Sequence, residues 1–321
     1  FLEEARFWSV ARTLAQVREN MHLVVEGTTS GLVTYYQFNE TQMGVDANDV
    51  AGGNNGTLQN APTRVSSDCP IGKGRSETIS VTTGGVKDFS TTGLQLEFPG
   101  SGTYPNGNLV VTQIDGIGAP TNIPSDVKTY PSSYWVIHNY GTNATFTELL
   151  GVTITLPNND VISANDEATP VNIKIYKRSS SAGNSENWTE IGSAASATAA
   201  TRTLVFNTFT PDFDSFSQLM AGATNTATSG LPVTLSRFEA LRLNETQVLL
   251  NWETISEINS LNFQILKSDN GVDFSIIGEQ DAAGNSTQTK QYAFVDTDAL
   301  RSAYYRLKQI DQNGTYTLSN I

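Results

Sequence analysis

The sequence predicts an all-β fold, built as tandem β-sandwiches with one short helix near the N-terminus. Short apolar stretches of alternating polarity recur along the whole 321-residue chain, and clusters of Gly, Asn, Ser and Asp separate them. Only 16% of the residues are charged, whereas Thr, which favours strands, and Asn, Ser and Gly, which favour turns, are frequent. This composition is typical of loop-rich extracellular β proteins.

The charge of the chain excludes some classes of partner. The formal net charge is −13, and Lys and Arg form no basic stripe, so nucleic acids and anionic membrane surfaces are unsuitable partners. No apolar stretch approaches the ~18 residues of a membrane-spanning helix. The acidic balance keeps the chain soluble, and a sharper interpretation is that some carboxylates bind calcium. The single cysteine, Cys69, excludes an internal disulfide.

Both ends of the chain carry strand-like sequence. Residues 1–8 (FLEEARFW) have the pattern of a strand, and Ile321 follows another such stretch directly. The sequence contains no signal peptide. We therefore expect a fragment of a longer polypeptide, with its signal and terminal segments outside this chain.

Residues 1–66 are expected to form the first unit. The spacing of Leu14, Val17 and Met21 predicts a helix over 11–22, and because that helix is short and alone, we expect it to cap a sheet. A strand is expected over 31–38. The run GGNNGTL (52–58) predicts a tight turn, since Asn-Gly favours such turns.

Four motifs follow one another in this unit: EARFWSVART (4–13), QVRENM (16–21), GLVTYYQFNE (31–40) and GNNGTL (53–58). Their order and spacing resemble the C-terminal part of a laminin-G/concanavalin-like jelly roll. The resemblance implies that the N-terminal strands of such a domain lie upstream, since a partial jelly roll leaves an open sheet edge. It also implies calcium binding, which is common in such domains.

A turn-rich linker is expected over 67–76, followed by a second β-sandwich over 77–223. Many short strands with almost no helical periodicity predict this sandwich, and Trp135 is expected to anchor its core. The motifs SYWVI (133–137), NYGTN (139–143) and FDSFSQL (213–219) resemble β-rich modules near the terminal region of secreted Bacteroidota proteins. The expected strands are 78–82, 94–98, 109–114, 133–138, 152–156, 173–176, 188–191, 203–206 and 215–221.

A polar linker over 224–230 leads to a third unit, 231–321. Its seven short strands match a fibronectin type III-like sandwich. Trp252 is expected in the core, and because Tyr304 and Tyr305 face opposite sides of a strand, one should be buried and one exposed. The sequence DQNG (311–314) predicts a tight turn. The expected strands are 231–235, 247–253, 262–268, 274–279, 292–296, 303–311 and 315–319.

The third unit carries a second set of motifs: LPV (231–233), FEA (238–240), LNWET (250–254), SEIN (256–259), AGNS (283–286) and YRLKQID (305–311). Together they resemble the sandwich that precedes the type A sorting domain of type IX secretion substrates. The resemblance implies an extracellular or outer-membrane cell-surface location, with the sorting domain following Ile321. The partners it implies are the secretion machinery and outer-membrane proteins.

One loop of the first unit is rich in side-chain oxygens, from Asp46, Asp49, Asn54 and Asn55, with Asn48 among them. Calcium takes about six to eight oxygen ligands of these types, so a calcium site is one interpretation of the loop. The other interpretation, in which the same residues make ordinary turns, stays open. A second candidate of this kind comprises Asn158–Asp160, Asp166 and Glu167. No other cofactor is expected.

No residue pattern predicts catalysis. His22 is expected to cap the helix and His138 to lie at the surface, and neither is near a Gly-x-Ser-x-Gly turn. Two histidines do not support a His-based zinc site, and Cys69 beside Asp68 is not expected to be reactive. Paired carboxylates can indicate a glycosidase. The candidate pairs are Glu3/Glu4, Asp46/Asp49 and Asp166/Glu167, and none of them lies in a recognisable catalytic motif.

Three aromatic residues, Tyr35, Tyr36 and Trp188, could form a sugar-binding platform, although core packing is the default interpretation. The whole sequence predicts a non-catalytic segment of a large secreted or cell-surface protein, an adhesin or display module related to gliding motility and exported by the type IX route. Its expected ligand is a glycan or a surface protein. The alternative is the non-catalytic C-terminal tail of a secreted polysaccharide- or protein-degrading enzyme.

Overall fold

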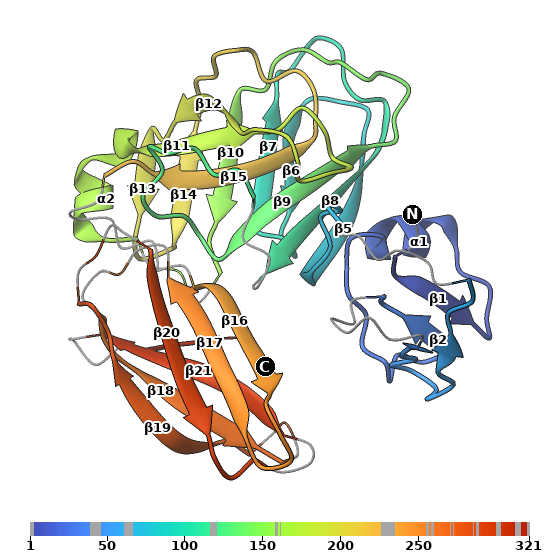
Figure 1. Cartoon of the computed structure of the whole chain (residues 1–321). Helices are drawn as coiled ribbons and strands as arrows, with labels where there is room; N and C mark the ends of the chain where they lie inside the picture. Colours follow the sequence, from blue (N-terminus) through green and yellow to red (C-terminus); the bar gives the residue numbers. More distant parts are fainter. Residues whose placement is uncertain are drawn as a thin grey trace.

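The predicted all-β fold is confirmed by the computed structural model, in which antiparallel sheets make up three successive β units (Figure 1). In the part of the chain that the structure describes, two short α-helices and one 3-10 turn accompany them. The residues that the structure describes are 3–38, 46–60, 67–115, 121–157, 160, 162–225, 235–254, 257, 260–269, 271, 273–284, 286, 289–299, 303–311 and 316–319.

The first unit is small and holds two pairs of strands. Strands β1 and β2 pair antiparallel with Phe7 opposite Thr34, and a short pair, β3 with β4, closes the loop that contains the predicted Asn-Gly turn. Tyr35 on β2 is fully buried. The elements are β1 (Ala5–Trp8), α1 (Leu14–Asn20), β2 (Leu32–Tyr36), β3 (Asp46–Ala47) and β4 (Gly56–Thr57).

Helix α1 is shorter than predicted and presents a different face to the protein. It begins after Thr13, whose hydroxyl accepts the backbone N–H of Gln16 in a capping box. It lies against β5 and β8, as expected of a helix that caps a sheet. However, the predicted apolar face points to solvent, because Leu14, Val17 and Met21 are 63%, 54% and 43% exposed.

The second unit is a two-layer sandwich. Five strands form one sheet in the order β13-β14-β10-β7-β6, and six form the other in the order β12-β11-β15-β9-β8-β5. Strand β9, which carries Trp135, lies inside the larger sheet, as predicted. The elements are β5 (Lys73–Val81), β6 (Gly85–Phe89), β7 (Leu94–Phe98), β8 (Gly107–Asp115), β9 (Ser133–Asn139), β10 (Gly151–Thr155), α2 (Ala164–Ala168), the 3-10 turn (Pro170–Asn172), β11 (Ile173–Lys177), β12 (Thr189–Ser193), β13 (Ser196–Thr198), β14 (Thr203–Phe206) and β15 (Gln218–Ala223).

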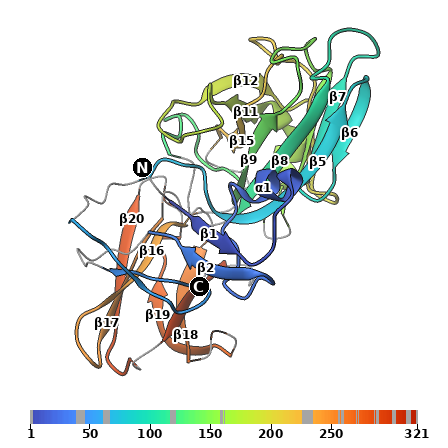
Figure 2. The same cartoon turned by 90° about the vertical axis from the view of Figure 1, so that its right-hand side faces the viewer.

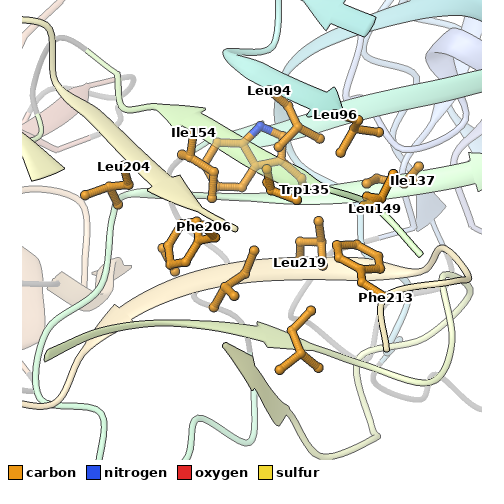
Figure 3. Packing of buried hydrophobic residues seen from close by; sticks show 14 of the residues in the cluster. Leu94, Leu96, Trp135, Ile137, Leu149, Ile154, Leu204, Phe206, Phe213 and Leu219 are labelled. Carbon is orange, nitrogen blue, oxygen red and sulfur yellow. The ribbon is translucent and has the colours of Figure 1, made fainter. Parts of the chain in front are cut away.

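The core of this sandwich gathers side chains from both sheets around Trp135 (Figure 3). Leu94 and Ile154 come from the smaller sheet, and Leu219 comes from the larger one. Trp135 is fully buried, and its indole N–H donates to the carbonyl of Thr92 at 2.8 Å. The buried polar atom is therefore satisfied, which lets the largest side chain serve as the core anchor.

The N-terminal boundary of the sandwich differs from the prediction. Strand β5 begins at Lys73, inside the segment 67–76 that was predicted as a linker. Gly74 suggested a turn, but it lies in the strand with φ of 148°, and a Cβ there would be 1.9 Å from the carbonyl oxygen of Gln113. Strands β6 and β13 and helix α2 were also not predicted.

Among its described residues, the third unit has seven strands in two sheets. Strands β16-β17-β20 form one sheet and β19-β18-β21-β22 the other, with every neighbouring pair antiparallel. The predicted first strand at 231–235 falls mainly on residues 231–234, which lie outside the described residues, as do residues 312–315. The elements are β16 (Leu235–Arg242), β17 (Val248–Thr254), β18 (Ser260–Ser268), β19 (Ser275–Asp281), β20 (Lys290–Asp296), β21 (Tyr304–Asp311) and β22 (Tyr316–Leu318).

The core of the third unit follows the sequence prediction. Trp252 is buried between the sheets, where its ring stacks on Tyr292 and meets Phe263 edge-on. Tyr305 is buried and the adjacent Tyr304 is 46% exposed, as the alternation of a strand requires.

The first unit rests on the larger sheet of the second unit, beside β5 and β8 (Figures 1 and 2). Leu23 forms a parallel bridge with Gly72, and the backbone N–H of Val24 donates to the carbonyl of Gly72 at 2.8 Å. These bonds fix the first unit at the start of β5. None of the helices within the described residues is long and apolar enough to cross a membrane.

Candidate functional site

The predicted calcium loop is organised around the carboxylate of Asp49. One oxygen, Oδ1, accepts the backbone N–H groups of Tyr35, Ala51 and Gly52 at 2.8, 3.0 and 3.1 Å, and Oδ2 accepts that of Asn54 at 3.1 Å. Burial alone would raise the pKa of Asp49, but these four donors outweigh it and lower the pKa to about 2. The carboxylate thus ties β2 to the loop that follows β3.

The other predicted ligands of this loop also have structural contacts. The side-chain oxygen of Asn55 accepts the backbone N–H of Asp49 at 3.0 Å, and the amide of Asn54 donates to the carbonyl of Gly52 at 3.4 Å. Asp46 pairs with Thr57 through the β3–β4 ladder. A cation at this loop would have to displace backbone N–H donors from Asp49, so the calcium site stays a prediction that the hydrogen bonds do not favour.

The described members of the second candidate set do not converge on one point. Asp160 is fully buried and accepts the backbone N–H of Ser132 at 3.1 Å, and burial raises its pKa to about 7. Asp166 belongs to the capping box of α2 with Ser163, while Glu167 accepts the backbone N–H of Ala199 at 2.6 Å. Asn158 and Asn159 lie outside the described residues. Among the described residues, no three or more His, Cys, Asp and Glu side chains are placed to hold a metal.

The two histidines meet, although the sequence did not predict it. His22 was expected to cap α1 at the surface, but it is only 5% exposed, and its Nε2 lies 2.6 Å from Nε2 of His138. The ring planes differ by 16° and the centroids are 4.9 Å apart. Because stacked rings cannot bring two nitrogen atoms to 2.6 Å, the rings are nearly coplanar and share one N–H···N hydrogen bond.

The flanking contacts determine which nitrogen carries each proton. Nδ1 of His22 lies 2.8 Å from the carbonyl oxygen of Pro70, so it must donate, and Nε2 of His22 must therefore accept from Nε2–H of His138. Nδ1 of neutral His138 then accepts from the hydroxyl of Ser181 at 3.4 Å. Burial lowers the pKa of both imidazoles, and the neighbouring His138 adds to the effect on His22, whose pKa is about 4.

The remaining sequence candidates have individual structural roles. Glu4 forms an ion pair with Arg6 at 2.9 Å and also accepts the hydroxyl of Tyr35, whereas Glu3 accepts the hydroxyl of Ser67. Cys69 is exposed. Core packing, the default interpretation, holds for Tyr35 and Trp188, which are both buried. Tyr36 is half-buried, and its hydroxyl donates to the carbonyl of Asn54 at 2.7 Å.

A buried arginine was missed because nothing in the sequence distinguishes it. Arg178 is 1% exposed, and its guanidinium lies 4.2 Å from the ring of Trp188. It donates to the side-chain oxygens of Asn184 and Gln218 at 2.6 and 3.0 Å and to the carbonyl of Thr121. Burial lowers its pKa to about 10. The guanidinium therefore holds the loop at 121 and the loop at 184 onto the larger sheet.

Two buried carboxylates organise the third unit. Glu257 accepts the hydroxyl of Thr254 at 2.8 Å and the backbone N–H of Ala283, and its backbone pairs with Ser286. The SEIN and AGNS motifs, which are far apart in the sequence, thus meet at Glu257.

The other buried carboxylate, Asp296, receives the ammonium of Lys267 at 2.9 Å and the hydroxyl of Tyr305 at 2.7 Å. Burial alone would raise the pKa of Asp296, but these donors together lower it. Asp296, at the end of β20, thus binds Lys267 of β18 and Tyr305 of β21. These contacts join the two sheets of the sandwich.

Comparison with known proteins gives little further identification. No protein-family model matches the chain, and no curated protein matches it. Among solved structures, the chain is similar to a β-1,2-glucanase from Parabacteroides distasonis, with 12% identity and a TM-score of 0.19 over 76% of this chain. The chain spans 36% of that protein's length. A likeness of this size carries no argument about fold or activity.

Proposed function

We propose that this chain is a non-catalytic display segment of a secreted or cell-surface protein. In this role its β units act as folded spacers that carry other parts of the protein away from the cell. The observation that carries the proposal is the path of the chain through the third unit, which suits a spacer in a series of domains.

That path follows from the strand pairing. Five residues separate β17 (Val248–Thr254) from β18 (Ser260–Ser268), so β18 begins at the end of the sandwich where β17 stops. Every neighbouring pair is antiparallel. Because the seven strands alternate in direction, β22 runs in the same direction as β16, and its last residue, Leu318, pairs with Lys308 partway along β21. Units with this geometry can be joined end to end without reversing the chain.

The use of polar side chains supports the same proposal. The buried charged groups with the most hydrogen bonds, Asp49, Arg178, Glu257 and Asp296, each bind the protein's own backbone or side chains. Catalytic carboxylates and bases instead need geometry that leaves an atom aimed at a substrate. The contacts of these four groups hold loops and sheets together, which supports a structural role.

The route of export is proposed from the sequence resemblance. The motifs of the third unit support type IX secretion, in which the partners would be the secretion machinery and outer-membrane proteins. Within the same proposal, the first unit would contact a glycan or a surface protein, with or without calcium. The runner-up role is the non-catalytic tail of a secreted polysaccharide- or protein-degrading enzyme.

The test uses the purified chain on a glycan array, in calcium and in chelator, together with a panel of polysaccharide and protein substrates. The proposal predicts no turnover of any substrate, and binding to a glycan class would identify the adhesive ligand. Turnover that survives repurification and is lost on a side-chain substitution in this chain would refute the non-catalytic role. Reading the sequence upstream then separates the two roles: repeated jelly rolls favour display, and a catalytic motif favours the enzyme tail.

A further inference from the structure

The two histidines lie on opposite sides of the boundary between the first unit and the central sandwich. His22 follows α1 in the first unit, and His138 is in β9 of the larger sheet. Around the pair, the guanidinium of Arg18 lies 3.8 Å from the ring centroid of Tyr140, and Thr78 donates to Glu19 at 2.6 Å. Polar side-chain contacts, among them the histidine pair, thus join the two units beside the apolar packing of Leu23 and the backbone bonds to Gly72.

The hydrogen bonds of the pair form a chain that has one direction. The hydroxyl of Ser181 donates to His138, His138 donates to His22, and His22 donates to the carbonyl of Pro70. Each imidazole supplies one N–H and one lone pair, so the chain is complete when both rings are neutral. We propose that the His22–His138 pair is a pH-sensitive latch, which fastens the first unit to the central sandwich at neutral pH and releases it on acidification.

Adding a proton breaks this arrangement in a way that can be followed atom by atom. A proton on Nε2 of His22 would face Nε2–H of His138 at 2.6 Å, which removes the central hydrogen bond. A proton on Nδ1 of His138 would keep that bond but would place an imidazolium, without a bound carboxylate, in a half-buried position. Both outcomes disfavour the docked arrangement relative to one in which the rings are hydrated.

The charged groups around the pair do not compensate for such a proton. From α1, Arg18 adds a further positive charge on Tyr140, whose ring centroid is 5.8 Å from that of His138, and the Glu19 carboxylate is bound by Thr78. The segments that contact the pair also carry Asp68 and Cys69, which precede Pro70, Glu186, which accepts the hydroxyl of Ser179, and Arg75, which lies 3.5 Å from Asp115. Neither imidazole has its pKa raised by any of these carboxylates.

The sign of the pH dependence follows from these shifts. The pKa of His22 falls from 6.5 in the hydrated state to about 4 when docked, and that of His138 is also lowered. Docking therefore has its full strength above pH 6.5 and weakens as the pH falls toward 4. For each proton taken up, the docking equilibrium constant falls about tenfold per pH unit within this window.

A bridging metal is the competing occupant of the same position. Zinc binds imidazole nitrogen at about 2.0–2.1 Å in tetrahedral sites, which would hold the two nitrogen atoms roughly 3.3 Å apart. The observed 2.6 Å is shorter than this separation and is close to the length of a direct hydrogen bond. Experiments on the latch are therefore made in chelator, and added Zn²⁺ serves as a separate arm.

The first test is an NMR titration of the imidazole nitrogens, which is unambiguous because the chain has two histidines. In chelator at pH 7.5, the latch predicts the Nδ1–H tautomer for His22, the Nε2–H tautomer for His138 and a scalar coupling between their Nε2 atoms. Both rings should stay neutral well below pH 6.5. Two independent titrations near pH 6.5, or no coupling between the rings, would overturn the proposal. Tautomer signals that appear only with Zn²⁺ would assign the site to a metal instead.

The second test measures docking by the distance between spin labels at Val33→Cys and Val86→Cys, two exposed positions, in a Cys69→Ser chain. The distribution should be narrow at pH 7.5 and broaden at pH 4.5, while labels at Val86→Cys and Val171→Cys within the central sandwich stay unchanged. The matched variant is His22→Gln/His138→Gln, an amide pair that does not titrate, whose distances should be the same at both pH values. Broadening of that variant at pH 4.5 to the wild-type extent would refute the latch. If the distance distribution of that variant is already broad at pH 7.5, the change of the wild-type distribution between pH 7.5 and 4.5 decides whether the latch exists.

Discussion

Asp49 should be the residue on which the fold of the first unit depends most strongly. Asp49→Ala leaves four backbone N–H groups without their acceptor. Each buried donor left unpaired costs about 1–3 kcal/mol, but those of Ala51, Gly52 and Asn54 lie at the half-buried or exposed loop and can bind water instead. We therefore expect a loss of roughly 2–4 kcal/mol, most of it from the donor of Tyr35 in β2.

Asp49→Asn provides the graded comparison. Its side-chain oxygen can still accept the three donors that now bind Oδ1, but the amide nitrogen would face the N–H of Asn54. The expected loss is smaller, about 1–2 kcal/mol. The assay is hydrogen–deuterium exchange of peptides that cover 32–36 and 46–57, measured in chelator. Protection should fall in the order wild type, Asp49→Asn, Asp49→Ala, with the exchange of the third unit unchanged.

Two results would contradict this role of Asp49. If Asp49→Ala exchanges like the wild type, the carboxylate does not hold the loop. If protection of the wild-type loop disappears in chelator and returns with calcium, the carboxylate acts as a metal ligand. The predicted calcium site would then be correct, and the structural role of the carboxylate would be wrong.

Three further predictions concern the other units. Tyr305→Phe removes a hydroxyl bound to a buried carboxylate and should cost about 1–3 kcal/mol in urea unfolding, whereas Tyr304→Phe at the exposed neighbour should stay within about 0.5 kcal/mol. Equal losses would contradict the burial argument. Gly74→Ala forces a side chain into the carbonyl of Gln113 and should destabilise by about 3 kcal/mol or more in thermal unfolding; a wild-type melting temperature would contradict the observed pairing of β5 with β8. For Asp160, burial raises the pKa from 3.8 to about 7, so its contribution to stability is fully present below pH 3.8 and is lost as the pH rises through 7. At 1.36 kcal/mol for each pH unit, the free energy of unfolding of Asp160→Asn should exceed that of the wild type by at most about 4 kcal/mol at pH 8 and by much less at pH 5. A difference that does not change with pH would be inconsistent with a buried, protonated carboxyl.

The sandwiches could be predicted from the sequence because their signals are local. In β17, Val248, Leu250, Trp252 and Thr254 are buried while the residues between them are half-buried, and the alternation of a strand produces that pattern directly. The Tyr304/Tyr305 pair follows the same rule. The core of the third unit is therefore encoded in short stretches that need no knowledge of the tertiary structure.

The errors arise where a local signal had two interpretations. Gly74 is a turn former by composition, but here it lets β5 approach Gln113 closely. Leu14, Val17 and Met21 have the spacing of a buried helix face, yet α1 uses Arg18 and Glu19 to contact its neighbours. Amphipathic spacing shows that a helix has two faces, and the tertiary contacts decide which one is covered.

The histidine pair could not be predicted from the sequence at all. His22 and His138 are 116 residues apart, and each alone has an ordinary interpretation as a surface or capping residue. Their meeting depends on how the first unit rests on the larger sheet, which is fixed by the Leu23–Gly72 bridge and by α1. Arg178 is a similar case, since its partners come from three separate segments.

The proposed display role is tested most directly by locating the protein on intact cells of the organism that produces it. An antibody raised against residues 235–319 is applied to unpermeabilised cells before and after treatment with proteinase K, with a periplasmic protein as the control. The display role predicts that the cells are labelled, that the protease removes the label and that the periplasmic control stays intact. Labelling only after the cells are permeabilised, with full protection from the protease, would contradict it.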